Sequence, residues 1–299
     1  MKICATADIS EYMQANLGNR EVGEVVLIHS TGMYLRFDTE IFLVCDKSWG
    51  QIPIGIAVED FLKTILMLRA EQGQRILLKD NQLVFPGSSI LLSPVRTPSE
   101  DLCTQAPKHR YVLQAAEELA ALQKITGISM LVLPLILGRP CDLIEQQNPY
   151  AVCAYPHLEK LIEAIQLNRS GEVAACTEKL MGLGPGLTPS ADDVLLGMLY
   201  VFRRLSQSQS AAVLSFQNAV GSLAKIRTNQ ISAAYLKAIM QGAPFERLER
   251  VYRGLCGMEL LNIEKLVQIG SNSGSEMLLG MLVALRICGY DVSKKEKLQ

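Results

Sequence analysis

The sequence has no excess of basic residues and few aromatic ones, and both shortages exclude classes of function. Its 299 residues include 29 Lys and Arg against 30 Asp and Glu, which gives a formal net charge of −1. A chain without a basic surplus has little to hold a nucleic-acid backbone or an anionic membrane. Aromatic residues make up only 6%, which argues against a base-stacking platform. We therefore expect neither nucleic acid nor membrane as a partner.

Histidine and paired cysteine are scarce as well. The histidines are His29, His109 and His157, and none of the eight cysteines forms a C-x-x-C pair. Zinc sites need closely spaced Cys and His ligands, so we expect no zinc site and assign no cofactor. The histidines also lie outside the motifs described below, so the sequence shows no Ser–His or Cys–His nucleophile.

Long apolar runs are missing too. The longest are "ISMLVLPLILG" and "VLLGMLYVF", and both are shorter than the roughly 20 residues that a transmembrane helix needs. The opening "MKICATADISEYM" lacks the apolar core of a secretory signal. These features predict a cytoplasmic protein with reduced thiols.

The first hundred residues have the pattern of a β-rich domain. Short runs of β-branched and aromatic residues, such as "EVVLIHS" and "EIFLVCD", lie between residues 22 and 57 and are separated by turn residues. A helix is expected over residues 57–73. "RILLKDNQLVFPG" predicts a hairpin that turns at Asp80 and Asn81, and "SSILLSPV" predicts one more strand.

Near residue 95 the pattern changes. "VRTPSEDLCTQAPKHR" is polar and contains two prolines, which is typical of a linker or long surface loop. The predicted fold class is α+β, with a β-rich N-terminal domain (barrel-like or a small sheet) over residues 1–100 and a larger, mostly α-helical domain over residues 101–299. Helices are expected near residues 109–125, 156–166, 170–181, 190–206, 210–241, 245–256, 259–268 and 273–288.

The stretch "GLGPGLTPSADD", residues 182–193, has an echo 83 residues further on. "SADDVLLGMLYVFR" aligns without gaps to "SGSEMLLGMLVALR", so that Asp193 corresponds to Glu276. Gly197 and Gly280 fall in the middle of the two predicted helices, where each costs about 1 kcal/mol relative to alanine. That cost makes sense if the two helices cross closely at these glycines.

One interpretation of the repeat is purely structural. Ser-x-x-Asp and Ser-x-x-Glu are capping boxes, in which the oxygen of Ser190 or Ser273 accepts from a free amide while the acid reaches back to another. On this interpretation the repeated segments only begin and pack two helices.

A second interpretation starts from the glycines, which a cap does not need. Glycines permit positive φ and let a ligand approach the backbone, and the amides at a helix N-terminus favour anions. If both N-termini converge, they combine amide donors with Asp192, Asp193 and Glu276. Such a mixture suits a ligand with an anionic group and an amine or amide. Alternatively, Asp192 and Asp193 hold a divalent cation, although we assign no metal.

A third polar segment, "RTNQISAAY", lies within a long predicted helix. Thr228, Ser232 and Tyr235 share one helical face by their spacing, with Asn229 adjacent and Arg227 at the head of the row. These groups either line a small polar site or form a solvated helix face.

The motifs resemble those of a bacterial family that includes the third subunit of the oxamate carbamoyltransferase of anaerobic allantoin (purine) degradation. "GLGPGLTPSADD" is similar to that family's GLGPGLTPSGDD signature, "IGSNSGSEMLLGML" to its second glycine-serine motif, and "RTNQIS" to its Thr-Asn-x-x-Ser segment. The resemblance spans roughly residues 110–290. The matching residues are Gly182, Gly184, Gly186, Thr188, Ser190, Asp192, Asp193, Thr228, Asn229, Ser232, Gly270, Ser273 and Gly274.

The sequence departs from the family pattern at three positions. Ala191 replaces the usual glycine, a change that adds only one methyl group. Asn272 stands where a small residue or serine is common, and Glu276 where aspartate is usual. The last change keeps the charge and lengthens the side chain, so a shared carboxylate role stays plausible while identical substrate geometry does not follow.

The resemblance implies a carbamoyltransferase complex with two larger partner subunits, in which oxalurate and phosphate give oxamate and carbamoyl phosphate. The predicted function is therefore a subunit that binds a small anionic or ureido substrate. Asp192 and Asp193 are the candidate catalytic residues. The candidate substrate-binding residues are Gly184, Gly186, Thr188, Ser190, Arg227, Thr228, Asn229, Ser232, Ser273, Gly274 and Glu276.

Two other functions stay open. The chain is alternatively a non-catalytic assembly subunit, whose repeated helices pack and whose polar loops bind a neighbouring chain. It is otherwise a stand-alone binder or hydrolase of a ureido acid.

Overall fold

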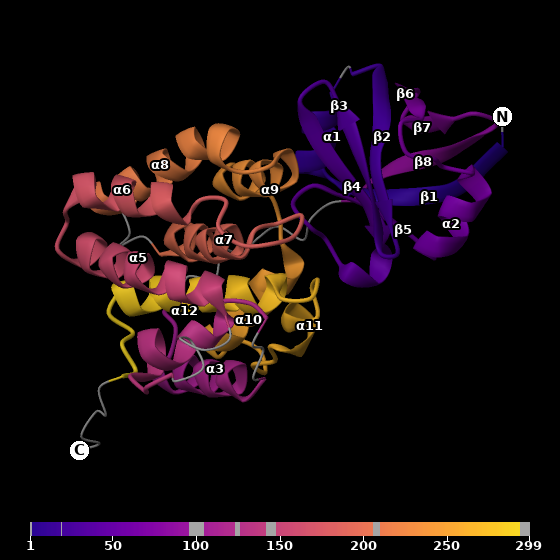
Figure 1. The fold of residues 1–299 in the computed structure, drawn as a ribbon. Coiled ribbons are helices and arrows are strands. Elements are labelled where there is room, and N and C mark those ends of the chain that lie inside the picture. Colours follow the sequence, from indigo (N-terminus) through magenta and orange to yellow (C-terminus); the bar gives the residue numbers. More distant parts are fainter. Residues whose placement is uncertain are drawn as a thin grey trace. The chain divides into compact units, whose positions relative to one another are not determined.

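The computed structural model describes residues 2–18, 20–95, 105–122, 126–141, 148–205 and 210–293. The chain divides into two compact units (Figure 1). One contains Met1–Glu100 with Gln241–Arg247, and the other contains Asp101–Met240 and Leu248–Gln299. That residues 1–100 and 101–299 are separate folding domains stays a prediction.

The N-terminal unit is built around a closed barrel of eight strands in the order β1-β5-β4-β3-β2-β6-β7-β8. The predicted α+β class, with a barrel-like N-terminal part followed by helices, is confirmed. Most neighbouring strands are antiparallel, whereas β1 pairs with β8 and β4 with β5 in parallel. The strands are β1 (Lys2–Ser10), β2 (Val22–His29), β3 (Gly32–Phe37), β4 (Glu40–Asp46), β5 (Gly55–Val58), β6 (Arg75–Lys79), β7 (Gln82–Phe85) and β8 (Ser88–Val95).

Local sequence explains much of the barrel. Met33, Leu35 and Phe37 are alternate residues of β3, so they share one face, and all three are fully buried. The β6–β7 hairpin turns at Asp80 and Asn81 as predicted, with φ of 50° and 57°, the left-handed values that a two-residue turn requires. The helix expected over residues 57–73 is shorter, because α2 (Phe61–Leu68) begins after an N-cap at Asp60. Two other short elements are α1 (Glu11–Leu17) and η1 (Lys47–Trp49).

Strand β1 was not expected from the sequence. Its residues "KICATADIS" include small and polar types and lack a clear alternation. The strand is held by its neighbours, since β1 pairs with both β5 and β8 and closes the barrel.

The segment Gln241–Arg247 groups with the barrel although it follows more than a hundred residues of the helical unit. Gln51 and Glu246 bond to each other twice, because the amide of Glu246 donates to the carbonyl of Gln51 (2.9 Å) and the amide of Gln51 to Oε2 of Glu246 (3.0 Å). Arg247 donates to the carbonyl of Trp49 at 3.0 Å. These bonds fix the segment to the loop that follows β4.

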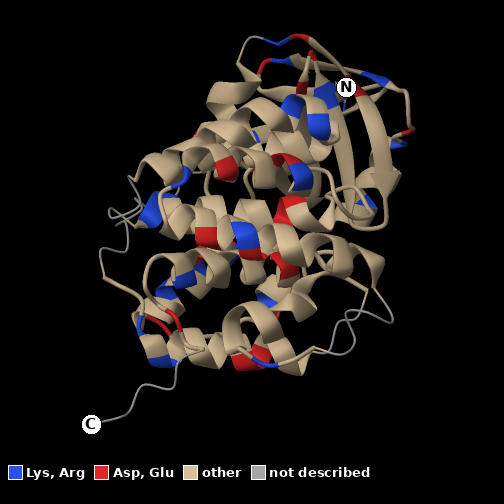
Figure 2. Cartoon of the chain, turned by 60° about the vertical axis from the view of Figure 1, so that its left-hand side comes forward, with Lys and Arg blue, Asp and Glu red and all other residues tan. Residues whose placement is uncertain are grey.

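The other unit is helical, and acidic and basic residues lie interspersed along its helices (Figure 2). Across the described residues, no helix combines the length and apolar character that a membrane span requires. The elements are α3 (His109–Ala121), η2 (Ser129–Leu131), η3 (Leu133–Leu137), α5 (Pro149–Gln166), α6 (Ser170–Leu180), α7 (Ser190–Arg204), α8 (Ala211–Arg227), α9 (Gln230–Met240), α10 (Glu246–Cys256), α11 (Glu264–Val267) and α12 (Ser273–Ile287).

The single helix predicted over residues 210–241 is wrong. It divides into α8 and α9 because Thr228 is extended, with φ −128° and ψ 177°. The side chain of Asn229 then accepts from the amides of Ile231 and Ser232, both at 3.0 Å. These contacts begin a new helix, as an N-cap does.

Helices α7 and α12 are the paired elements of the sequence repeat, and they pack backbone to backbone. A Cβ atom added to Gly197 would lie 2.0 Å from the carbonyl oxygen of Met277, and one added to Gly280 would lie 2.0 Å from that of Val194. Val194 and Met277 are themselves equivalent in the repeat. The two contacts are therefore reciprocal, and the predicted close crossing is present.

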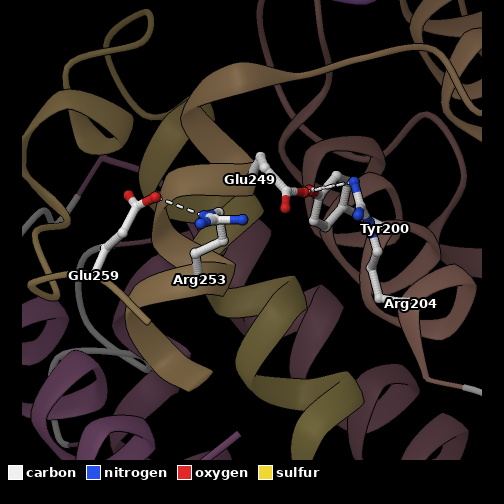
Figure 3. Close-up of polar contacts among 5 residues, drawn as sticks. All are labelled: Tyr200, Arg204, Glu249, Arg253 and Glu259. Carbon is white, nitrogen blue, oxygen red and sulfur yellow. Dashed lines mark hydrogen bonds and ion pairs between the residues drawn. The ribbon is translucent and has the colours of Figure 1, made fainter. Parts of the chain in front are cut away.

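The far end of α7 is anchored by a polar cluster (Figure 3). Arg204, whose side chain is only 8% exposed, pairs with Glu249 of α10 at 2.5 Å. Tyr200 also donates to Glu249, and Arg253 pairs with Glu259 at 2.5 Å. The two contacts to Glu249 hold the C-terminal half of α7 against α10, and the glycine crossing holds its middle against α12.

Gly197→Ala is expected to destabilise the helical unit by about 1–3 kcal/mol or more, because the new methyl group overlaps the backbone of α12. The free energy of unfolding can be measured by urea denaturation followed by circular dichroism. Gly171→Ala in α6 is the matched control. Its added Cβ has no heavy atom within 4 Å, so about 0.5–1 kcal/mol should be gained from helix propensity. Equal stability of both variants would contradict the close crossing.

Candidate active site

The glycine loop, residues 182–187, adopts a backbone that glycine alone tolerates well. Gly182, Gly184 and Gly186 have φ of 80°, 121° and 99°, values that residues with a Cβ rarely adopt. Space is also limited, because a Cβ on Gly184 would lie 2.5 Å from the amide nitrogen of Ser190. The three glycines therefore allow the backbone of the loop to turn into α7.

The capping-box interpretation of the repeat is wrong. The N-cap of α7 is Pro189 and that of α12 is Asn272, and neither helix has a side-chain capping bond. Ser190 and Ser273 are the first residues inside their helices. Asp193 and Glu276 therefore lie in the first turns without the roles that a capping box would give them.

Asp193 lies between the two helix beginnings. It is 1% exposed, and the hydroxyl of Thr188 donates to its Oδ2 at 3.0 Å. The same Thr188 oxygen lies 3.0 Å from Oγ of Ser273 at the start of α12. Thr188, Asp193, Ser273 and Glu276 thus form one polar group, which we call the acid cluster. The structure brings together these four predicted site residues from both repeats.

Burial raises the pKa of Asp193 well above its usual value, and the negative charge of Glu276 raises it further. Hydrogen bonds from Ser273 and Thr188 oppose these effects. The cause is general, because two neighbouring buried carboxyls resist carrying two negative charges. Asp193 is therefore suited to keep a proton that an exposed aspartate has lost.

Glu276 is held from outside the repeat by residues that sequence reasoning missed. The amide of Ile128 donates to Oε1 of Glu276 at 3.0 Å. A Cβ on Gly127 would lie 2.5 Å from the same oxygen. Asn148, itself buried, donates to the carbonyl of Gly127 at 2.6 Å. Gly127 was visible in the sequence only as a break between helices, and no spacing connected it to residue 276.

Asp192 points to a different set of partners from those of Asp193. Its Oδ1 accepts from the amide of Gly182 at 2.7 Å. Its Oδ2 accepts from Ser232 at 2.7 Å and also from Thr228. Burial raises the pKa of Asp192, and these three hydrogen bonds oppose the rise. A cation bound at Asp192 would have to displace N–H and O–H donors.

Other predicted site residues serve the surrounding structure. Arg227 pairs with Glu178 of α6, and both side chains are about half exposed. Asn229 begins α9, as described above, and the shared helical face predicted for Thr228, Ser232 and Tyr235 is interrupted at Thr228. A Cβ on Gly274 would lie 1.7 Å from the carbonyl oxygen of Leu266, so this glycine lets α11 pack on α12.

The tip of the glycine loop presents backbone donors beside the acid cluster. Among the residues that the structure describes, no hydrogen-bond partner is present for the amides of Gly184, Gly186 and Leu187. Gly186 and Leu187 are exposed, and Thr188, which follows them, bonds to Asp193. Amide donors and buried acids therefore lie within a few residues of one another.

One comparison with known proteins bears on this region. Residues 180–285 match the model of the family described as oxamate carbamoyltransferase subunit AllH. The match covers about a third of the chain, includes all three motifs and excludes the barrel. It supports the family predicted from the motifs and a subunit of an oxamate carbamoyltransferase complex, without testing the motif residues themselves. The search of solved structures found no match.

Asp193→Asn is expected to raise the stability of the ligand-free protein at neutral pH, because the neutral amide needs to take up no proton on folding to avoid a buried charge beside Glu276. Asp193 has a raised pKa in the folded state, so the folded protein holds a proton that the unfolded chain has already released. The stability from this group is present at low pH and is lost as pH rises through the folded pKa. The advantage of the variant should therefore grow with pH.

Thermal unfolding of both proteins, from about pH 4, near the ordinary pKa of an aspartate, to above neutral pH, measures the effect. A gain of about 1 kcal/mol raises Tm by about 2–4 °C for a domain of about 150–250 residues. Asp38→Asn, at a side chain that is 75% exposed, is the control and should change little. A variant that is less stable than the wild type at every pH would contradict a cost of burying the Asp193 carboxyl beside Glu276.

Proposed function

We propose that this chain, which over residues 180–285 matches the family described as oxamate carbamoyltransferase subunit AllH, supplies the small-molecule site of such a complex. The proposed reaction takes oxalurate and phosphate to oxamate and carbamoyl phosphate. The observation that carries the proposal is the acid cluster, in which the beginnings of α7 and α12 bring Asp193 and Glu276 together.

The chemistry of the cluster favours a ligand with two different ends. Carboxyl and hydroxyl oxygens accept hydrogen bonds from an NH₂ group, so the cluster suits the amide end of a ureido acid. The amides at the tip of the glycine loop suit an anionic end, as do helix N-termini. Oxalurate has both a carbamoyl NH₂ and a carboxylate, and phosphate supplies a second anion.

The proposed transfer moves one proton as well as the carbamoyl group. An oxygen of phosphate attacks the carbamoyl carbon of oxalurate, the bond from that carbon to the oxamate nitrogen breaks, and the nitrogen takes up a proton. Asp193, with its raised pKa, is placed to give that proton and to regain one from the hydrogen phosphate ion. A carboxyl whose pKa is raised above its ordinary range is the type of group that general-acid catalysis uses.

The remaining predicted residues have supporting roles in this proposal. Glu276 accepts from the amide of Ile128, and in this proposal it also accepts from the substrate NH₂. Thr188 and Ser273 orient Asp193. Arg227 clamps an anion only after leaving Glu178, and such a half-exposed ion pair is weak enough to exchange.

Ligand binding is tested by thermal shift with oxalurate, oxamate, carbamoyl phosphate and phosphate, on the isolated chain and on the reconstituted complex. A ligand of the native state raises Tm, and at about 100 times its Kd the stabilisation is about 2.7 kcal/mol. Asp193→Asn should abolish this shift while Asp38→Asn keeps it. Absence of a shift with all four compounds, in both preparations, would sink the proposal. Calorimetry and product analysis on the isolated chain distinguish a stand-alone hydrolase.

A second candidate function, a non-catalytic assembly subunit, is favoured by apolar side chains on the barrel unit. Leu62 and Leu66 on α2 are 61% and 77% exposed, and Ile3 of β1 is 51% exposed. Large exposed apolar residues that occur together are typical of protein interfaces. The family description supports partner subunits, of which we propose two.

Leu66→Ser is expected to weaken assembly with the partner subunits and to leave the Tm of the isolated chain nearly unchanged, because the side chain is already exposed. Size-exclusion chromatography of the reconstituted complex measures the effect. Leu214→Ser, at an exposed leucine of α8 on the helical unit (49%), gives the comparison and should leave assembly unchanged. Asp193→Asn separates the two functions, since the catalytic proposal requires assembly to persist while turnover is lost. Normal turnover of Asp193→Asn leaves only the assembly function.

A further inference from the structure

We propose that Asp192 is a positioning residue, which holds the base of the glycine loop against the break between α8 and α9 and does not touch the ligand. The inference rests on the function proposed above, because the loop is taken to be part of the ligand site. It gives the two adjacent acids of the motif different roles and explains why the Thr-Asn-x-x-Ser segment accompanies the glycine motif.

The contacts of Asp192 join three separate parts of the chain. Gly182 donates from the first residue of the glycine loop, Thr228 from the break between the helices, and Ser232 from the first turn of α9. Asp192 itself is 1% exposed in the first turn of α7. With both oxygens engaged by protein donors, the carboxylate has little capacity left for a substrate.

The base of the loop is fixed, whereas its tip is open. A Cβ on Gly182 would lie 2.2 Å from the carbonyl oxygen of Arg227, so the loop starts in direct contact with the end of α8. The carbonyl of Leu183 also accepts from the amide of Ala191 at 2.9 Å. Asp192 holds this contact by accepting from the amide of Gly182. The amides of Gly184 and Gly186 follow at the tip of the loop.

The helix break provides the geometry that Asp192 needs. The side chain of Asn229 accepts from the amide of Ser232, which fixes the first turn of α9 and aims the hydroxyl of Ser232 at Asp192. Thr228, being extended, directs its own hydroxyl to the same oxygen. A continuous helix through residue 228 would not present both hydroxyls to one carboxylate.

Conservative and non-conservative substitutions separate positioning from catalysis. In Asp192→Asn, the amide oxygen still accepts from Gly182, and the NH₂ group donates to Thr228 and Ser232, whose hydroxyls accept as well as donate. Asp192→Ala removes all three contacts. A positioning role therefore predicts rescue by asparagine, whereas an acid–base role predicts that asparagine and alanine are equally inactive.

Two measurements on the full chain test this. Hydrogen exchange at the Gly182 amide should accelerate by about tenfold or more in Asp192→Ala and stay within about threefold of wild type in Asp192→Asn. The Kd for oxalurate should weaken by about tenfold in Asp192→Ala and by less than about threefold in Asp192→Asn. Phosphorolysis by the reconstituted complex should follow the same order.

Further variants keep the test decisive if Asp192→Ala does not fold. Thr228→Val and Ser232→Ala each remove one hydroxyl, and both should speed exchange at Gly182. Thr177→Val is the control, because Thr177 is also fully buried but donates within α6, to the carbonyl of Val173 at 2.8 Å. Hydrogen exchange at the Gly182 amide of this control variant should match that of the wild type.

Three results overturn the inference: unchanged exchange at Gly182 in Asp192→Ala, unchanged exchange in both hydroxyl variants, or an Asp192→Asn complex as inactive as the alanine variant. Failure of the proposed function is distinguishable from these. Wild-type protein that does not bind oxalurate removes the ligand site, while the exchange measurement still decides whether Asp192 holds the loop.

Discussion

The close crossing of α7 and α12 is the contact on which the rest of the helical unit depends. Gly197 and Gly280 let the two backbones touch within two turns of the helix N-termini. Because Thr188, before α7, contacts Ser273 at the start of α12, the crossing brings two helix N-termini and their partial positive charges close together. Asp193 and Glu276 lie in these two first turns, where the helix dipoles favour a negative charge. The same crossing that gathers the acids therefore gives an electrostatic reason for their presence.

The repeat is symmetric in its packing and asymmetric in its polar chemistry. Asp193 and Glu276 occupy equivalent positions, but Asp192 is equivalent to Ser275. Asp192 has three donors, whereas the buried hydroxyl of Ser275 has no hydrogen-bond partner among the described residues. Glu276 instead receives an amide from Ile128, outside the repeat. Only one half carries a glycine loop tied by a carboxylate, so the apparent duplication contains a single loop-type site.

The features predictable from the sequence were those encoded locally or by repetition. Asp80 and Asn81 specify their turn by their own conformational preference, and the shared "LLGML" revealed the helix pair. Strand β1 was missed because its pairing with β5 and β8 lies far away in sequence. The break at Thr228 was missed because the extended conformation is stabilised by a hydrogen bond to Asp192, which is distant in the sequence. The contact of Gly127 with Glu276 left no periodic signal at all.

Adjacent carboxylates acquire different chemistry from the kind of donor that each faces. A backbone N–H can only donate, so Oδ1 of Asp192 accepts from Gly182 whether the acid is protonated or ionised. This bond fixes the orientation of the Asp192 side chain. Asp193 faces the hydroxyls of Thr188 and Ser273, which can donate or accept. Its hydrogen-bond network can therefore reverse direction when a proton arrives or leaves, with no movement of the backbone. Asp192 also faces two hydroxyls, but its Oδ1 is engaged by a backbone N–H, which cannot accept. An acid that must change protonation inside a packed crossing needs partners that can reverse direction, and Thr188 and Ser273 provide them for Asp193.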